Sequence, residues 1–170
     1  MLDVVEVRVV PKSGCYVVEI VYEQKEANVV SGDAVAGVDL GLVNLVTLTT
    51  NQPGIAPLLI KGGALKAINT YYNKQKAKLQ GDLETRHSRK VSRRLDALTM
   101  KRNNRVNNYL HTTSRRVIDW CVDHNIKTLI IGKNDGWKNG IQIGRKNNQQ
   151  FVNIPHAKLV PQLAYKTGWY

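Results

Sequence analysis

The sequence predicts an α/β protein in which a β-hairpin precedes a mixed sheet and a long, basic helical hairpin interrupts that sheet. Three observations support this fold class. Apolar residues alternate near the N-terminus, they recur every three or four positions over residues 65–120, and a short apolar segment at 128–131 follows that helical region. With 170 residues the chain has room for one ordinary domain plus an appendage, and its 42% hydrophobic content is enough for a core.

The first segment of the chain is expected to be a hairpin. Residues Val4–Val10 and Tyr16–Tyr22 alternate like two strands and are joined through Pro11–Gly14, which is rich in turn formers. We assign residues 1–30 to this hairpin and residues 34–170 to the main domain.

The sheet is expected to start at Val35–Asp39, in a strand that runs on through Leu45 to Thr49. The Asn51–Gly54 turn then returns the chain to a further β segment that ends at Ile60.

Two helices are expected next. Residues 65–79 and 91–120 each carry a narrow stripe at steps of three and four, and a polar break at 81–88 separates them. We expect an antiparallel helical hairpin within 61–125, with basic outer faces. The aromatic members of these stripes are expected to be core residues rather than base-stacking platforms. They are Tyr72, Tyr109 and Trp120.

The C-terminal part returns to the sheet and then forms a helix. Thr128–Ile131 is predicted to be a short, apolar strand, and Asn125 before it suits the end of a helix. Ile154 and Pro155 open a last helix with the proline in its first turn. Pro161 is expected to bend or break that helix.

The charge is concentrated. Residues 1–39 have a net charge of −4, whereas residues 61–116 contain fifteen basic and three acidic residues, a net charge of +12. Such a block indicates a polyanionic partner, with a solvated helical face as the alternative. Between residues 100 and 118 no acid pairs the cations, which favours nucleic acid. These cations are Lys101, Arg102, Arg105, Arg115 and Arg116.

Several other classes are excluded. No run approaches the ~20 apolar residues of a membrane span and no secretory pattern opens the chain, so we expect a cytoplasmic protein. Cys15 and Cys121 lack a nearby cysteine partner and are expected to be reduced and inert. The histidines show no metal-ligand spacing, so exposed or capping roles are expected for them.

One carboxylate stands out. Asp39 lies in an apolar run between Gly37 and Gly41, so we expect a core position, where an ionised carboxylate is costly unless it is paired or metal-bound. The glycines let another backbone or a phosphate approach. This layout suits a metal-binding aspartate on the first strand of an RNase H-like sheet. A similar motif occurs in actin-like and Hsp70-like ATPases, but those need two such domains and far more chain.

Several motifs in order resemble the transposon-encoded OrfB/TnpB-type proteins, which are RNA-guided DNA endonucleases with a RuvC-like domain and kinship to type V CRISPR effectors. They are the Asp39 strand, the basic helical hairpin, the apolar strand at 129–131, the run Gly132–Lys138, and the run Asn148–His156. The resemblance covers nearly the whole chain. It matches residues 1–30 to the wedge-like strands before the nuclease domain and residues 34–170 to a RuvC-like domain.

The resemblance implies DNA cleavage in which three carboxylates hold two Mg²⁺ ions. Asp39 matches the first carboxylate and is the expected catalytic and metal-binding residue. Gly132 stands where the second is normally a glutamate, as in a subset of the family. Asp135 is a possible substitute, although capping the turn at Gly136 is the alternative role.

The third carboxylate is expected beyond the last helix, whereas the sequence stops at Tyr170. The four-cysteine zinc insert and most of the N-terminal region of the family are also missing. We therefore expect a truncated endonuclease that cleaves inefficiently alone, with Mg²⁺ as cofactor and DNA and guide RNA as partners.

Two hypotheses follow. The chain is either a nuclease fragment or a non-catalytic remnant that grips RNA or DNA through its basic hairpin. Charge reversal at Arg102 and Arg105 is expected to weaken binding and flatten its salt dependence. Without the final strand the sheet has an open edge, either at Val35–Val38 or at Leu129–Ile131, so we also expect self-association or a complementing polypeptide.

Overall fold

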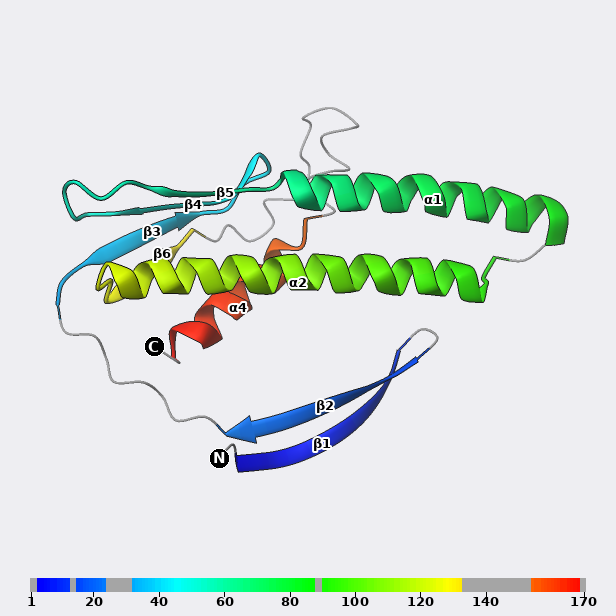
Figure 1. Cartoon of the computed structure of the whole chain (residues 1–170), viewed down its shortest axis with the longest axis horizontal. Helices are drawn as coiled ribbons and strands as arrows, with labels where there is room; N and C mark the ends of the chain where they lie inside the picture. Colours follow the sequence, from blue (N-terminus) through cyan, green and yellow to red (C-terminus); the bar gives the residue numbers. More distant parts are fainter. Residues whose placement is uncertain (1–2, 13–14, 24–31, 88–89, 133–153, 169–170) are drawn as a thin grey trace.

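The computed structural model describes residues 3–12, 15–23, 32–87, 90–132 and 154–168, and the structural statements below refer to these residues. Figure 1 shows a two-stranded hairpin, a separate mixed sheet, two long helices side by side, and a short helix near the C-terminus. This arrangement confirms the predicted α/β class.

The N-terminal hairpin consists of β1 (Asp3–Lys12) and β2 (Cys15–Glu23), which pair antiparallel. It touches the rest of the protein lightly, for example where the Cys15 Sγ lies 3.5 Å from the Met100 Sδ. Side chains on one face of the hairpin, among them Val9 and Val18, are more than 60% exposed. The described part of the protein therefore leaves an apolar face of the hairpin uncovered.

The main sheet is mixed and has the strand order β5-β4-β3-β6. Strand β3 pairs antiparallel with β4 and parallel with β6, and β4 pairs antiparallel with β5. The bounds are β3 Val35–Asp39, β4 Asn44–Thr50, β5 Leu58–Lys61 and β6 Thr128–Ile131. A strand follows the helical hairpin, as the sequence predicts, and the structure places this strand, β6, beside β3.

One part of the sheet differs from the prediction. The single strand expected to continue past Asp39 is instead two antiparallel strands, because the backbone reverses directly after that residue. A Cβ atom on Gly41 would lie 2.8 Å from the carbonyl oxygen of Asn44, and one on Gly62 would lie 2.6 Å from that of Leu42. Only glycine permits such close backbone approach, so these two glycines allow the turn to close.

The helical hairpin consists of α1 (Gly63–His87) and α2 (Arg93–Asp123), which run antiparallel (Figure 1). Two bonds between them fix their register. The Tyr72 hydroxyl lies 3.2 Å from the Thr99 hydroxyl, and Arg102 Nε donates to Asn69 Oδ1 over 2.8 Å. The predicted antiparallel pair is therefore confirmed.

The ends of these helices have local causes. The polar break expected from residue 81 is wrong, because α1 continues to His87. Gly81 costs roughly 1 kcal/mol relative to alanine, too little to end a helix whose next residues are mostly compatible with helical backbone. Helix α2 begins where the Ser92 hydroxyl accepts the Leu95 N–H over 3.2 Å, and Asn125 follows its end with a φ of 51°.

The last helix, α4 (His156–Thr167), is present as predicted, but Pro155 caps its start and does not lie in its first turn. The expected break at Pro161 is wrong, because the helix continues through it. Leu159 and Leu163 on either side of Pro161 have 0% exposure. Their burial, worth roughly 1.5–3 kcal/mol for each side chain, offsets the cost of an internal proline.

Helix α2 is at the centre of the core, because α1, α4 and one face of the sheet all pack near it (Figure 1). Its residues Val106, Leu110 and Val117 are buried together with Val38 of β3 and Leu48 of β4. None of the helices in the described ranges is long and apolar enough to cross a membrane.

Candidate functional site

Asp39 ends β3 and is exposed, so the expectation of a core position is wrong. Side chains alternate between the two faces of a strand. Ala36 and Val38 point into the core with 0% and 4% exposure, which directs Asp39 to the opposite face. The carboxylate therefore needs no partner to be stable there, and its position leaves it open to solvent.

Gly132 lies beside Asp39 at the carboxyl ends of two parallel strands. Val38 pairs with Ile131, and the Gly132 N–H donates to the Val38 carbonyl over 3.0 Å. Asp39 and Gly132 are therefore the next two positions along the neighbouring strands. Among the described residues, a Cβ atom on Gly132 would meet the Val38 carbonyl oxygen, at an ordinary 3.5 Å. The described backbone thus leaves room for a Cβ atom at the position where the sequence lacks a side chain.

Few side chains near Asp39 in the described part of the chain could act as metal ligands. Thr47 of β4 pairs directly with Asp39, so the hydroxyl and the carboxylate share one face of the sheet. The described residues contain no group of three or more histidine, cysteine, aspartate or glutamate side chains that could hold a metal ion. Asp135 lies outside the described residues. One carboxylate and one hydroxyl do not fit a two-Mg²⁺ site, which needs several carboxylates.

His156 connects the last helix to the turn after Asp39. Its Nε2 lies 3.1 Å from the Gly41 carbonyl oxygen, and the side chain is 3% exposed. Because a carbonyl only accepts, Nε2 carries the proton in this contact. The exposed or capping role expected for this histidine is therefore wrong, and its contact fixes the backbone two residues beyond Asp39.

Three of the five predicted nucleic-acid-binding cations lie exposed on one side of α2. Lys101, Arg105 and Arg116 are separated by four and eleven residues, which correspond to about one and three helical turns. Within the described ranges no ion pair engages any of the three. We call these three residues the α2 cation row.

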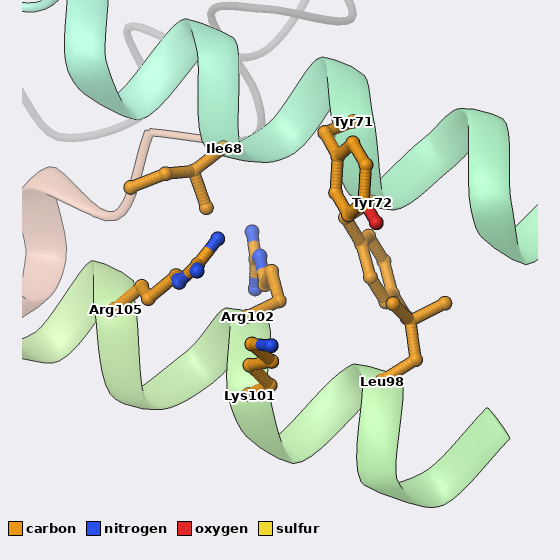
Figure 2. A pocket seen from close by; sticks show the side chains of 7 residues that line it. All are labelled: Ile68, Tyr71, Tyr72, Leu98, Lys101, Arg102 and Arg105. Atoms are coloured by element: carbon orange, nitrogen blue, oxygen red, sulfur yellow. The ribbon is translucent and has the colours of Figure 1, made fainter. Parts of the chain in front are cut away.

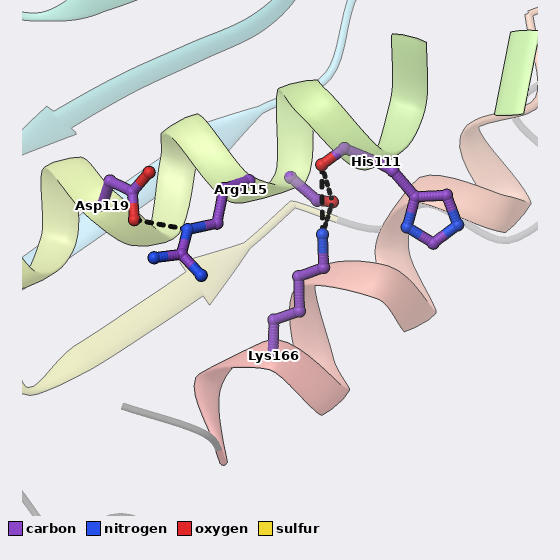
Figure 3. A network of polar contacts seen from close by, with 5 residues as sticks. His111, Arg115, Asp119 and Lys166 are labelled. Carbon is purple, nitrogen blue, oxygen red and sulfur yellow. Dashed lines mark hydrogen bonds and ion pairs between the residues drawn. The ribbon is translucent and has the colours of Figure 1, made fainter. Parts of the chain in front are cut away.

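The other two predicted cations have partners. Besides its bond to Asn69, Arg102 lies over the Tyr72 ring, 5.6 Å from the ring centroid. Arg115 Nε lies 2.7 Å from Asp119 Oδ1, one turn further along α2 (Figure 3). The expectation that no acid pairs these cations is therefore wrong for Arg115, whose acid lies just beyond the stretch considered.

Two further surface residues belong with this region and were missed from the sequence. Arg94 is exposed seven residues before Lys101, on the same side of α2. The heptad spacing could have revealed it. Tyr71 is 57% exposed on α1 and lies at a small pocket shared with Lys101 and Arg105 (Figure 2). Its neighbour Tyr72 is half-buried, as expected for a stripe residue.

Helix α4 is tied to the opposite side of α2 by a buried lysine. Lys166 Nζ donates to Ser114 Oγ over 2.7 Å and to the His111 carbonyl over 3.0 Å (Figure 3). Burial chiefly, and the charge of Arg115 secondly, lower the pKa of Lys166. Lost hydration and then the charge of Lys166 also lower the pKa of His111. These contacts hold α2 in place behind its exposed cations.

Comparisons with known proteins agree with this architecture. A family described as "Probable transposase", OrfB_IS605, matches residues 19–138. No curated protein matches the chain. Among solved structures the chain is similar to Cas12f1, from the cryo-EM structure of the Cas12f1-sgRNA-target DNA complex, with 15% identity and a TM-score of 0.68. The match covers 96% of this chain and 33% of that one, so the fold is shared and this chain spans a third of that relative's length.

Proposed function

The chain belongs to the OrfB_IS605 family of probable transposases, and on this premise we propose that it is a transposon-encoded protein that binds DNA and guide RNA through its helical hairpin. The observation that carries the proposal is the α2 cation row. Its three side chains are exposed and form no ion pair in the described part of the chain, so their charge is available to a polyanion.

The energetic basis is counterion release. A cation that neutralises a phosphate of duplex DNA releases condensed ions and contributes a slope near −0.9 to the dependence of log K on log salt. Arg115 is paired with Asp119, and Arg102 is held against α1. Each of these two arginines should therefore contribute less to the salt slope than a residue of the α2 cation row does. The proposed contact surface is therefore narrower than the five cations expected from the sequence.

We further propose that the chain corresponds to part of an RNA-guided, Mg²⁺-dependent endonuclease in which Asp39 is the first metal ligand. Bound Mg²⁺ would neutralise the charge that develops on a phosphate during hydrolysis. The described residues supply one carboxylate there, and Gly132 occupies the neighbouring position without a side chain. We therefore expect inefficient cleavage by this polypeptide alone.

The alternative function is a non-catalytic remnant that binds RNA or DNA. Gly132 favours it, because a lost metal ligand removes cleavage while the α2 cation row keeps its surface. The two functions share the binding step and differ only in whether a carboxylate elsewhere completes the site at Asp39.

A complementing polypeptide or a second copy is part of the proposal. Strand β6 is an edge of the sheet in the described residues, and Ile130 on it is 59% exposed. Open edges with apolar side chains favour pairing with another chain. Sedimentation should show a mass that rises with concentration, and Ile130→Lys should reduce that rise. A monomer at all concentrations would contradict this part of the proposal.

The binding proposal is tested by titrating labelled duplex DNA at several salt concentrations. The test variant is Lys101→Glu/Arg105→Glu, and the matched control is Lys127→Glu/Lys158→Glu, which changes two exposed lysines outside the hairpin by the same type of reversal. The test variant should bind more weakly and lose about 0.9 from the salt slope for each phosphate contact removed. Equal losses in both variants would mean that only the net charge matters and would contradict the proposed surface.

A further inference from the structure

The pocket between α1 and α2 combines an exposed aromatic ring with cations. Tyr71 and Tyr72 reach it from α1, and Lys101, Arg102 and Arg105 reach it from α2 (Figure 2). None of the described residues that line it is acidic. The pocket therefore offers an apolar surface and positive charge in one place.

The two adjacent tyrosines have different environments. Tyr72 is engaged within the fold, by the Thr99 hydroxyl at 3.2 Å and by the Arg102 guanidinium over its ring. Tyr71 is 57% exposed, and its hydroxyl has no hydrogen bond within the described ranges. Packing therefore accounts for the position of Tyr72 and leaves the ring of Tyr71 accessible.

From these contacts we infer that the surface around this small pocket binds single-stranded nucleic acid, with one base stacked on the exposed ring of Tyr71 and neighbouring phosphates held by Lys101 and Arg105. The inference rests on the proposed function and specifies the strand state of its ligand. Bases of a duplex are stacked on one another, whereas a single strand presents free base faces to aromatic side chains. Cations beside the ring suit the phosphates on either side of that base.

Arg102 has a positioning role in this arrangement. Its bond to Asn69 and its place over the Tyr72 ring hold the guanidinium against α1, which keeps the two helices at the spacing that forms the pocket. Lys101 and Arg105 flank it on α2 and remain exposed. The pocket is thus formed before a strand arrives, and less ordering is needed on binding.

The test measures binding of a labelled single-stranded RNA and of the duplex with the same sequence. Tyr71→Leu should lower affinity for the single strand about tenfold and leave the duplex and the salt slope unchanged, because stacking adds no phosphate contact. Tyr71→Phe should keep affinity within about twofold, since the ring and not the hydroxyl stacks. Tyr16→Leu is the matched control, because Tyr16 is 76% exposed on the N-terminal hairpin and should bind like the wild type.

The outcomes distinguish a failure of the stacking inference from a failure of the proposed binding function. If Tyr71→Leu binds the single strand as well as the wild type while Lys101→Glu/Arg105→Glu does not, the stacking inference is wrong and the binding function stands. If Tyr71→Leu weakens single-strand and duplex binding equally, the preference for a single strand is wrong. If the wild type binds neither nucleic acid, the proposed function and the inference both fail.

Discussion

Asp39 and Gly132 occupy neighbouring positions at the carboxyl ends of two parallel strands, β3 and β6. The Gly132 N–H donates to the Val38 carbonyl over 3.0 Å, so the register is fixed one residue before Asp39. A metal site at this edge of the sheet would draw its first two ligands from these positions. The chain supplies a carboxylate at one of them and a hydrogen atom at the other.

Restoring the missing side chain should create a divalent-cation site. A Cβ atom fits at Gly132, so Gly132→Glu is expected to fold and to place a second carboxylate beside Asp39. Ligand binding to the folded state raises its stability, by about 2.7 kcal/mol at 100 times Kd. The melting temperature of Gly132→Glu should therefore rise with Mn²⁺ or Mg²⁺.

Two controls accompany the Gly132→Glu variant. Gly132→Gln has nearly the same shape without the charge, and Gly132→Glu/Asp39→Asn lacks the first ligand. Neither should respond to the cation as Gly132→Glu does. An equal response in all three would show that the cation binds elsewhere.

Removing the Asp39 charge should have little effect on folding. The side chain is exposed, and within the described residues no hydrogen bond or ion pair engages it. Asp39→Asn should change the free energy of unfolding by no more than about 0.5 kcal/mol in urea titrations. A loss above about 2 kcal/mol would mean that the carboxylate is bonded in the folded protein.

Arg115 and Arg116 are adjacent in sequence and should differ in binding. Arg116 has no ion-pair partner in the described ranges, whereas Arg115 is 2.7 Å from Asp119. Arg116→Gln is expected to reduce the salt slope for duplex DNA by about 0.9, and Arg115→Gln to reduce it by less. When Asp119→Asn is also present, Arg115→Gln should reduce the salt slope by nearly as much as Arg116→Gln does. Equal slopes for both arginine variants would show that the ion pair does not matter.

The junction of α2 and α4 should respond to pH through His111. The pKa of His111 is lowered from its ordinary 6.5, so in the window below 6.5 the unfolded chain binds this proton more readily than the folded protein. The contribution of His111 to the free energy of unfolding is fully present above pH 6.5. It is lost as the pH falls through the pKa that His111 has in the folded protein.

Lys166→Met tests the cause of that shift. It removes the second-largest contribution, the lysine charge, and leaves the lost hydration in place. The pKa of His111 measured by NMR titration should therefore rise toward its ordinary value. An unchanged pKa would show that the lysine charge does not reach the imidazole.

The fold could be predicted where the pattern of apolar residues is unambiguous. The segment Thr128–Ile131 is short, apolar and bounded by polar residues, and β6 has these same bounds. The helical stripes likewise predicted α1 and α2, because a period near 3.6 over many residues excludes a strand. The positions that failed depend on packing between elements, which no local pattern contains.

The position of Asp39 illustrates that limit. Its apolar neighbours suggested burial, but the face on which a strand residue lies follows from which alternate residues meet the core. Ala36 and Val38 meet it, so Asp39 does not. In the turn that follows, the Asn44 carbonyl lies close to Gly41 and the Leu42 carbonyl lies close to Gly62. These two glycines were the sequence signal for that turn.

The candidate contact surface was predicted in part. The charge count located the basic hairpin, but it could not show that Arg102 faces α1, where Asn69 accepts its hydrogen bond. The spacing of four between Arg115 and Asp119 was visible in the sequence and is typical of a helical ion pair. The helical stripe contained Tyr72 and not Tyr71, but the place of Tyr71 beside Lys101 and Arg105 follows only from the pairing of the two helices. The domain boundaries at residues 30 and 34 stay predictions.

The central claim is that this chain binds nucleic acid and lacks a complete cleavage site. The most direct test is a native-gel titration of supercoiled plasmid in Mg²⁺ with the wild type and Asp39→Ala, read for both shifted and nicked DNA. We predict shifted, intact plasmid with both proteins. Nicking by the wild type that disappears in Asp39→Ala would show that another carboxylate completes the site, and an unshifted plasmid with both proteins would contradict the binding function.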